Sequence, residues 1–220
     1  AVLNNTEMQA IAALVKNYNL LVISDEIYAE LRYDGPPSSF ASLPGMQERT
    51  ILVSGFSKAF AMTGWRVGYV AAHPEFLAAM VKIHQYTILC APVMGQMAAL
   101  EALRNGRQDV ERMVAEYDRR RRFMVSRLRE MGLECFEPRG AFYVFPSIKV
   151  TGLTSTEFAE QLLKEEKVAV VPGPAFGSTG EGFIRCSYAT SLAELTEALN
   201  RIERFVSRRL AFNYRAVVHA

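Results

Sequence analysis

The stretch ILVSGFSKAFAMTGWR at residues 51–66 decides how the rest of the chain is interpreted. It begins with a short apolar run, 51–53, which predicts a buried strand, and Lys58 follows among small and hydroxyl residues. Open α/β folds bind ligands at the carboxyl ends of their strands, and the pattern carries Lys58 to such an edge. An isolated lysine is usually solvated. A lysine at this edge can instead lose its solvation shell and act as a nucleophile toward carbonyl compounds.

Helical and apolar segments alternate around this stretch. Residues 6–18 have the spacing of an amphipathic helix, with Thr6 and Gln9 as the expected capping box. The apolar run at 20–23 predicts a buried strand that ends at Asp25. A helix followed by a strand at this spacing is typical of a parallel sheet. Further expected elements are a strand at 67–72 and helices at 74–82 and 94–103.

The second half of the sequence predicts a smaller, separate domain. Asn105-Gly106 is the clearest break, so we expect domains at 1–105 and 106–220. A long helix is expected across 109–131. Short strands are expected at 133–136, 142–145, 168–171 and 182–187, with helices at 156–166, capped by Thr154 and Glu157, and at 191–206. This mixture is typical of an α+β domain.

Composition narrows the possible partners. Half of the 220 residues are hydrophobic and the formal net charge is +2, which favours a globular protein that binds neither nucleic acid nor an anionic membrane. The arginine run 119–122 is interpreted as a solvated helix face. No apolar run approaches the roughly 20 residues that span a bilayer. Cys90, Cys135 and Cys186 lack metal-ligand spacing, and their apolar contexts predict buried, reduced thiols in a cytoplasmic protein without a metal.

Three further motifs are collinear with the lysine stretch: SDEIY at 24–28, GAFYVFP at 140–146 and FIRCSYA at 183–189. Together the four resemble the class I and II aminotransferases, which are fold type I pyridoxal-phosphate enzymes. The resemblance extends over essentially the whole chain but matches only the later part of such an enzyme. It implies an α/β fold: the later part of a mostly parallel large-domain sheet in 1–105, followed by a small α+β C-terminal domain in 106–220.

The resemblance also implies roles for three residues near the predicted strand ends. Lys58 would hold pyridoxal 5'-phosphate covalently and then, as a free amine, move a proton at the substrate's α-carbon. Asp25 would place a carboxylate beside the pyridine nitrogen, and Tyr28 would place its hydroxyl against the cofactor's phenolic oxygen. Judged by position alone, Asp25 fits a turn or cap equally well, and Tyr28 fits a packed side chain.

Phosphate and carboxylate binding are assigned in the same way. Arg66 would pair with the cofactor phosphate through its planar guanidinium, with Ser57 as a second ligand. A common family pattern has serine three places before the lysine; here Gly55 stands there and Ser54 one place earlier, so Ser57 is preferred. Arg185 matches the family arginine that clamps the substrate α-carboxylate when the second domain closes. A surface arginine is the alternative.

The function implied is transfer of an amino group from an amino acid to a 2-oxo acid by a homodimeric enzyme. Two alternatives stay open: a β-lyase, which would share every residue named, and a non-catalytic effector domain of a transcription regulator. The family's phosphate loop, ring-stacking aromatic residue and Asn-Pro-x-Gly motif normally precede the aspartate strand, and none is present in this sequence. We therefore expect either a fragment of a longer enzyme or a chain whose remaining part is a separate chain or lost. Alone, it should be inactive and should expose strand edges and apolar surface.

Overall fold

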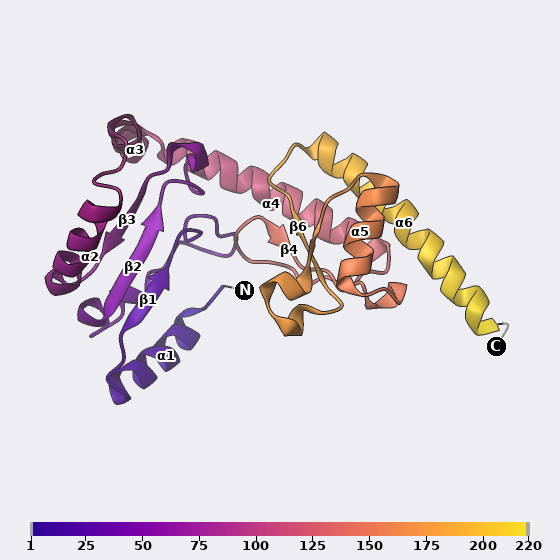
Figure 1. Ribbon diagram of the computed structural model, residues 1–220, viewed down its shortest axis with the longest axis horizontal. Helices are drawn as coiled ribbons and strands as arrows, with labels where there is room; N and C mark the ends of the chain where they lie inside the picture. Colours follow the sequence, from indigo (N-terminus) through magenta and orange to yellow (C-terminus); the bar gives the residue numbers. More distant parts are fainter. Residues whose placement is uncertain (1, 219–220) are drawn as a thin grey trace. The chain divides into compact units, whose positions relative to one another are not determined.

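The structure is a computed structural model that describes residues 2–218, with side chains up to residue 210. The chain divides into two compact units. The first comprises the residues up to 115 together with 139–141, and the second comprises 116–138 and the residues from 142 onward. The division lies within the long helix α4 (Arg107–Glu130; Figure 1). Asn105-Gly106, the expected boundary, separates α3 from α4, and the assignment of domains stays a prediction.

A three-stranded sheet organises the first unit (Figure 1). The elements in chain order are α1 (Asn5–Asn17), β1 (Val22–Asp25), β2 (Thr50–Gly55), β3 (Gly68–Ala71), α2 (Pro74–Thr87) and α3 (Val93–Asn105). The central strand β2 pairs in parallel with β1, with Asp25 opposite Val53. It pairs antiparallel with β3, with Gly55 opposite Gly68. The alternation of helix and strand that the sequence predicts is therefore present.

Strand β1 differs from its prediction. The apolar run at 20–23 was expected to be a buried strand, but Leu20 and Leu21 precede β1 and are exposed. Ile23, within the strand, is 73% exposed. A continuous apolar run is buried only when both faces of the strand are covered, and β1 is an edge strand that pairs with β2 alone.

The capping box of α1 is formed by residues other than those predicted. The Asn4 side chain accepts a hydrogen bond from the Glu7 amide at 2.9 Å, and the Glu7 carboxylate accepts one from the Asn4 amide at 2.7 Å. The expected pair, Thr6 and Gln9, lies inside the helix. Both pairs have the required spacing of three, and asparagine accepts from the backbone at least as well as threonine.

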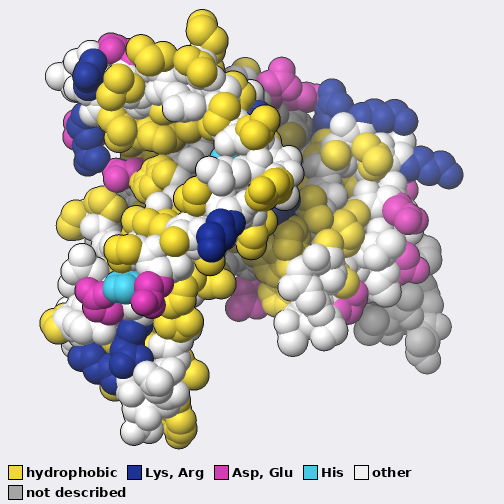
Figure 2. Space-filling model, turned by 60° about the vertical axis from the view of Figure 1, so that its left-hand side comes forward, with side chains coloured by type: hydrophobic (Ala, Val, Ile, Leu, Met, Phe, Trp, Pro, Cys, Tyr) yellow, Lys and Arg dark blue, Asp and Glu magenta, His cyan; other side chains and the backbone are white. Residues whose placement is uncertain are grey.

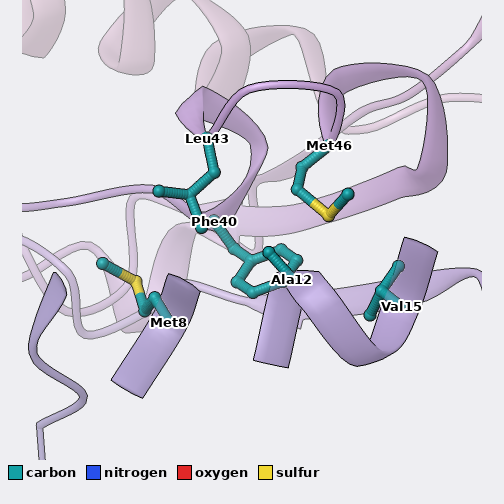
Figure 3. Packing of buried hydrophobic residues seen from close by; sticks show 6 residues of the cluster. All are labelled: Met8, Ala12, Val15, Phe40, Leu43 and Met46. Carbon is teal, nitrogen blue, oxygen red and sulfur yellow. The ribbon is translucent and has the colours of Figure 1, made fainter. Parts of the chain in front are cut away.

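Two apolar clusters hold the first unit together. Figure 3 shows the first cluster, in which side chains of α1 face those of the 3-10 turn η1 (Phe40–Ser42) and of the residues between it and the next 3-10 turn, η2 (Gln47–Arg49). Its members are Met8, Ala12, Val15, Phe40, Leu43 and Met46. In the second cluster, Phe56, Met62 and Val67 pack against Ala99 of α3. Both clusters therefore fix the loops that leave the sheet.

The second unit is an α+β arrangement around another small sheet. Its strands are β4 (Tyr143–Val144), β5 (Val171–Pro172) and β6 (Ile184–Ser187), with β6 central and both pairs antiparallel. Its further helices are α5 (Ser155–Glu166) and α6 (Leu192–Val218). The predicted capping box of Thr154 and Glu157 at α5 is confirmed. Phe158 of α5 packs edge-on against Phe205 of α6, with ring centroids 5.1 Å apart, and both side chains are fully buried.

The strand predicted at 133–136 is wrong. Leu133 and Cys135 are buried, as a strand pattern requires, but the segment has no partner strand within the described residues. Its carbonyl groups accept isolated hydrogen bonds instead of a strand ladder. The Glu134 carbonyl accepts from the Ser147 amide, and the Cys135 carbonyl accepts from the Arg129 guanidinium. Alternating burial is therefore produced here by an irregular segment.

The arginine run 119–122 is only partly the solvated face that was expected. Arg119 and Arg120 pair with Glu116 one turn earlier. Arg121 is buried, and it donates to Asp118 at 2.6 Å and to Glu137 at 2.7 Å. A buried guanidinium needs such partners, because an unpaired charge is costly away from water. The run therefore anchors the segment that follows α4.

Asp118 gives this region a defined response to acid. Hydrogen bonds from Arg122 and Arg121 outweigh the opposing effect of burial and lower the pKa of Asp118. Its unfolded pKa is about 3.9, so the stability it contributes is present above about pH 4 and is lost as the pH falls through the lowered value. We expect Asp118→Asn to cost about 1–3 kcal/mol at neutral pH and to flatten the acid dependence. Urea unfolding at several pH values tests this; an unchanged acid profile would contradict it.

The matched control for that substitution is Asp109→Asn. Asp109 belongs to the same helix and pairs with Arg112, but both side chains are exposed to solvent. Exposed ion pairs contribute about 0–1 kcal/mol. The control should therefore leave the free energy of unfolding nearly unchanged.

The cysteine prediction is confirmed for two of the three thiols. Cys135 and Cys186 are buried, and desolvation raises the pKa of Cys186 to about 12. Cys90, expected to be buried, is exposed in the segment between α2 and α3. An apolar sequence context does not bury a residue when the neighbouring apolar side chains are themselves exposed, as Leu89 is. Across residues 2–218, no helix combines the length and apolar character required to cross a bilayer.

Candidate functional site

The carboxyl edge of the β1–β2 pair brings the main predicted residues into one region of the first unit. Because the two strands are parallel, they end at the same edge of the sheet. Asp25 is the last residue of β1, and Lys58 follows the end of β2. Tyr28 lies in the turn after β1, and the Lys58 Nζ is 5.9 Å from the centroid of its ring. An amine, a phenol and a strand-end carboxylate therefore share this edge.

Asp25 takes part in a local turn. Its Oδ1 accepts a hydrogen bond from the Ile27 amide at 3.1 Å. This is the turn role that position alone suggested, and it uses one carboxylate oxygen. The other oxygen, Oδ2, makes no hydrogen bond among residues 2–218, and the residue is exposed. The turn therefore orients the carboxylate and leaves Oδ2 able to accept a bond.

The loop from Ser57 to Arg66 is closed by its own hydrogen bonds. The Thr63 hydroxyl donates to the Ser57 carbonyl at 2.9 Å, and the Arg66 Nη1 donates to the Thr63 carbonyl at 2.9 Å. Arg66 has a left-handed backbone with φ of 56°, which follows the 3-10 turn η3 (Thr63–Trp65). Its guanidinium is exposed and has no carboxylate partner in the described part of the chain. Ser57 and Arg66 thus belong to one ordered loop.

The glycine that replaces the family serine has a structural explanation. A Cβ at Gly55 would lie 3.0 Å from the Gly68 Cα and 3.0 Å from the Val67 carbonyl oxygen, because β2 and β3 approach closely there. The neighbouring Ser54 hydroxyl donates to the Glu26 carbonyl at 3.3 Å. Ser54 therefore contributes to joining β2 to the turn after β1.

Glu26 is a structural residue of this edge to which the sequence analysis gave no role. Its Oε1 accepts hydrogen bonds from the Ser24 hydroxyl at 2.9 Å, the Ser39 hydroxyl at 2.9 Å and the Phe40 amide at 3.1 Å. It thereby fastens the loop before η1 to the end of β1, directly beside Asp25. The sequence gives no signal for this, because spacing does not show where a loop returns.

We expect Glu26→Gln to loosen that loop. The amide keeps an acceptor oxygen but loses the charge that strengthens three hydrogen bonds, so the free energy of unfolding should fall by about 1–2 kcal/mol. Chemical denaturation measures the loss. Glu160→Gln on α5 is the control, since Glu160 is exposed and should be nearly neutral. Equal effects of both substitutions would show that Glu26 does not anchor the loop.

Arg185 lies in the second unit, on β6, opposite Val171 of β5. Its strand neighbours Ile184 and Cys186 are buried, as the sequence predicts. The Arg185 Cζ is 4.6 Å from the centroid of the Tyr143 ring and 4.4 Å from that of Phe176. It forms no ion pair with any residue between 2 and 210. The guanidinium is therefore held by aromatic faces rather than by a carboxylate.

Comparison with known protein families shows where this arrangement of a lysine, a tyrosine and an aspartate at a sheet edge belongs. A family model for "Aminotransferase class I and II" matches residues 1–202. The chain belongs to this family.

Individual proteins agree with that assignment. The chain is 57% identical to YugH of Bacillus subtilis, over 94% of this chain and 54% of that protein. It is 51% identical to an aspartate aminotransferase of Pyrococcus abyssi, over 95% of this chain and 54% of the relative. The crystal structure of an aromatic aminotransferase from Pyrococcus horikoshii OT3 superposes with a TM-score of 0.92 at 51% identity, covering 95% of this chain and 56% of that one. The chain spans about half the length of the curated relatives it matches.

The family uses pyridoxal phosphate, and the residues of the first unit fit that group chemically. An amine can bind its carbonyl carbon, a carboxylate can face its ring nitrogen, and a phenol can face its phenolic oxygen. The Ser57 hydroxyl and the Arg66 guanidinium, which has no carboxylate partner among the described residues, lie in one loop and are suited to its phosphate. Among the described residues, no group of three or more His, Cys, Asp or Glu side chains could hold a metal ion.

Proposed function

We propose that the whole protein is a pyridoxal-phosphate-dependent aminotransferase that transfers an amino group from an amino acid to a 2-oxo acid. The observation that carries this proposal is the position of Lys58, beside Tyr28 at the carboxyl edge of β1 and β2, in a chain of this family. Two of the relatives are named for aspartate and for aromatic amino acids, so the proposal specifies an α-amino acid and leaves its side chain open.

Each of the site residues of the first unit would have a distinct role in cofactor binding or proton transfer. When bound, the cofactor supplies a ring that accepts electrons from the substrate's α-carbon. Lys58 holds it, then takes the α-proton and returns one, which requires an amine with an unprotonated state. Asp25 contributes the negative charge that keeps the ring nitrogen protonated. Tyr28 donates a hydrogen bond to the phenolic oxygen, and Ser57 and Arg66 bind the phosphate.

Arg185 is proposed to bind the α-carboxylate shared by both substrates. A guanidinium offers two parallel N–H donors to the two carboxylate oxygens, which gives orientation as well as affinity. Such a residue should carry no competing carboxylate, and Arg185 has none within the described chain. This assignment needs only a carboxylate on the substrate and is independent of its side chain.

We also propose that the protein is a cytoplasmic homodimer. Figure 2 shows broad hydrophobic areas on the face of the first unit that is turned forward. Large apolar side chains of α2, α3 and the segment between them are exposed, and Tyr86 is exposed to 93%. The others are Val81, Ile83, Ile88, Leu89, Val93, Met94, Met97, Leu100 and Leu103. Exposed apolar surface of this kind supports association, and free thiols support a reducing compartment.

The test is an assay of the complete protein with pyridoxal phosphate, a panel of L-amino acids and 2-oxo acids, with products identified by mass spectrometry. Paired formation of a new amino acid and a new 2-oxo acid is the expected result. Release of pyruvate with a leaving group would identify a β-lyase instead. Cofactor binding without turnover would favour a non-catalytic domain. The 220-residue chain assayed alone should show no turnover, and analytical ultracentrifugation of the complete protein tests the dimer.

A further inference from the structure

The guanidinium of Arg185 is one member of a continuous row of aromatic contacts in the second unit. The Arg185 Cζ lies 4.6 Å from the centroid of the Tyr143 ring and 4.4 Å from that of the Phe176 ring. Phe176 in turn meets Phe145 edge-on, with centroids 6.1 Å apart and planes at 76°. Phe145 stacks on Phe183 at 5.5 Å with nearly parallel planes. The row fixes each ring through its neighbour.

We propose that Phe176 is a positioning residue for carboxylate binding. Together with Tyr143 it restrains the Arg185 guanidinium by ring contact, so that the in-plane N–H groups are presented ready for an α-carboxylate. The proposal rests on the proposed function in one respect: it takes Arg185 as the carboxylate ligand. It adds Phe176 as a residue that restrains the Arg185 side chain before the carboxylate binds.

The physical reason is the shape of the guanidinium. Its charge attracts the faces of aromatic rings, while its five donors all point outward in its plane. Contact with rings therefore restrains the group without using any donor. A long arginine side chain loses rotamer freedom when it binds a ligand, and restraint before binding reduces that loss. An ion pair with a carboxylate would also restrain it but would compete with the substrate.

Phe176 is held in place by its backbone as well as by Phe145. It ends the 3-10 turn η5 (Gly173–Phe176), which packs against η6 (Ser178–Gly180). A Cβ at Gly173 would lie 1.9 Å from the Gly180 carbonyl oxygen, so only glycine allows this approach. The Gly173 amide also donates to the Phe183 carbonyl at 2.9 Å. A partly exposed phenylalanine is thus placed beside Arg185 by a closely packed turn.

The experiment compares three variants of the complete, cofactor-loaded protein. Phe176→Leu removes the ring and keeps apolar bulk, and Phe176→Tyr restores a ring. Phe136→Leu is the matched control, because Phe136 is 67% exposed, lies in the same unit and makes no ring contact among the described side chains. The readouts are KM and kcat for an amino acid and a 2-oxo acid. A further readout is the single-turnover rate with the primary amine that lacks the carboxylate.

Phe176→Leu should raise KM for both substrates about 2- to 12-fold, the range that corresponds to immobilising one long side chain on binding. The kcat and the rate with the primary amine should change little, and Phe176→Tyr should behave like the unaltered protein. Calorimetric titration with a non-reacting carboxylic acid should show the same weakening without any turnover. If Phe176→Leu changes KM no more than Phe136→Leu does, the proposal is overturned. An equal loss of reactivity toward the amino acid and toward the amine would also overturn it, since that result indicates general disruption of the site.

The two proposals fail in different ways. If the unaltered protein transfers no amino group but Phe176→Leu still weakens carboxylate binding in the titration, the proposed function is wrong and the positioning role stands. If amino transfer is found and the titration is unaffected by Phe176→Leu, the positioning role alone is wrong.

Discussion

Replacing Lys58 by arginine is expected to abolish amino-group transfer. A guanidinium stays protonated at any accessible pH, so it can neither bond to a carbonyl carbon nor accept the α-proton. Loss of a positioned base alone costs about 10²–10⁴-fold in rate, and loss of the covalent link adds to that. The residual kcat should therefore lie at least about 10³-fold below that of the unaltered protein.

Two measurements check this result. Steady-state assays of the complete protein give kcat, and borohydride reduction followed by peptide mapping shows whether the cofactor is attached to residue 58. Lys164→Arg provides the matched control: Lys164 is exposed on α5, so the same change of group should have no effect there. An adduct mapped to another lysine, or full activity in Lys58→Arg, would refute the assignment of the site.

Phe158→Ala is expected to cause the largest loss of stability. The Phe158 ring is fully buried between α5 and α6 against Phe205, and its removal leaves a cavity that the two helices cannot close. Substitutions of this kind cost about 3–5 kcal/mol. Because domains are typically stable by about 5–15 kcal/mol, much of the stability of the second unit would be lost.

Denaturant unfolding followed by circular dichroism measures this effect. Phe136→Ala removes an identical ring from an exposed position of the same unit and should change the free energy of unfolding by less than about 0.5 kcal/mol. If the two substitutions destabilise equally, the packing of α5 on α6 is not what stabilises this unit.

The parts of the fold that the sequence predicts well are those fixed by local pattern. The strand before Lys58, the helix after Pro74 and the capping box at Thr154 each depend on neighbours within a few residues. The family motifs additionally predict the order of these elements along the chain. The roles proposed for Lys58 and Asp25 rest on those motifs and stay predictions.

The parts that were missed depend on contacts between distant residues. Glu26 accepts hydrogen bonds from a loop 13 and 14 residues further along the chain. The buried Arg121 pairs with Glu137, 16 residues away. The exposure of Ile23 depends on which other segments cover the sheet, and the apolar character of Ile23 alone does not indicate this. Likewise, the two aromatic rings on Arg185, Tyr143 and Phe176, come from two separate segments, and no spacing in the sequence indicates that they meet.

The unequal burial of the three thiols makes the protein suited to site-specific labelling. Cys90 is exposed, whereas Cys135 and Cys186 are buried and the desolvated Cys186 stays protonated at neutral pH. A maleimide dye should therefore modify a single position without any engineered cysteine. That position lies among the exposed apolar side chains between α2 and α3. The labelling rate of the complete protein would then report directly whether another polypeptide covers this surface.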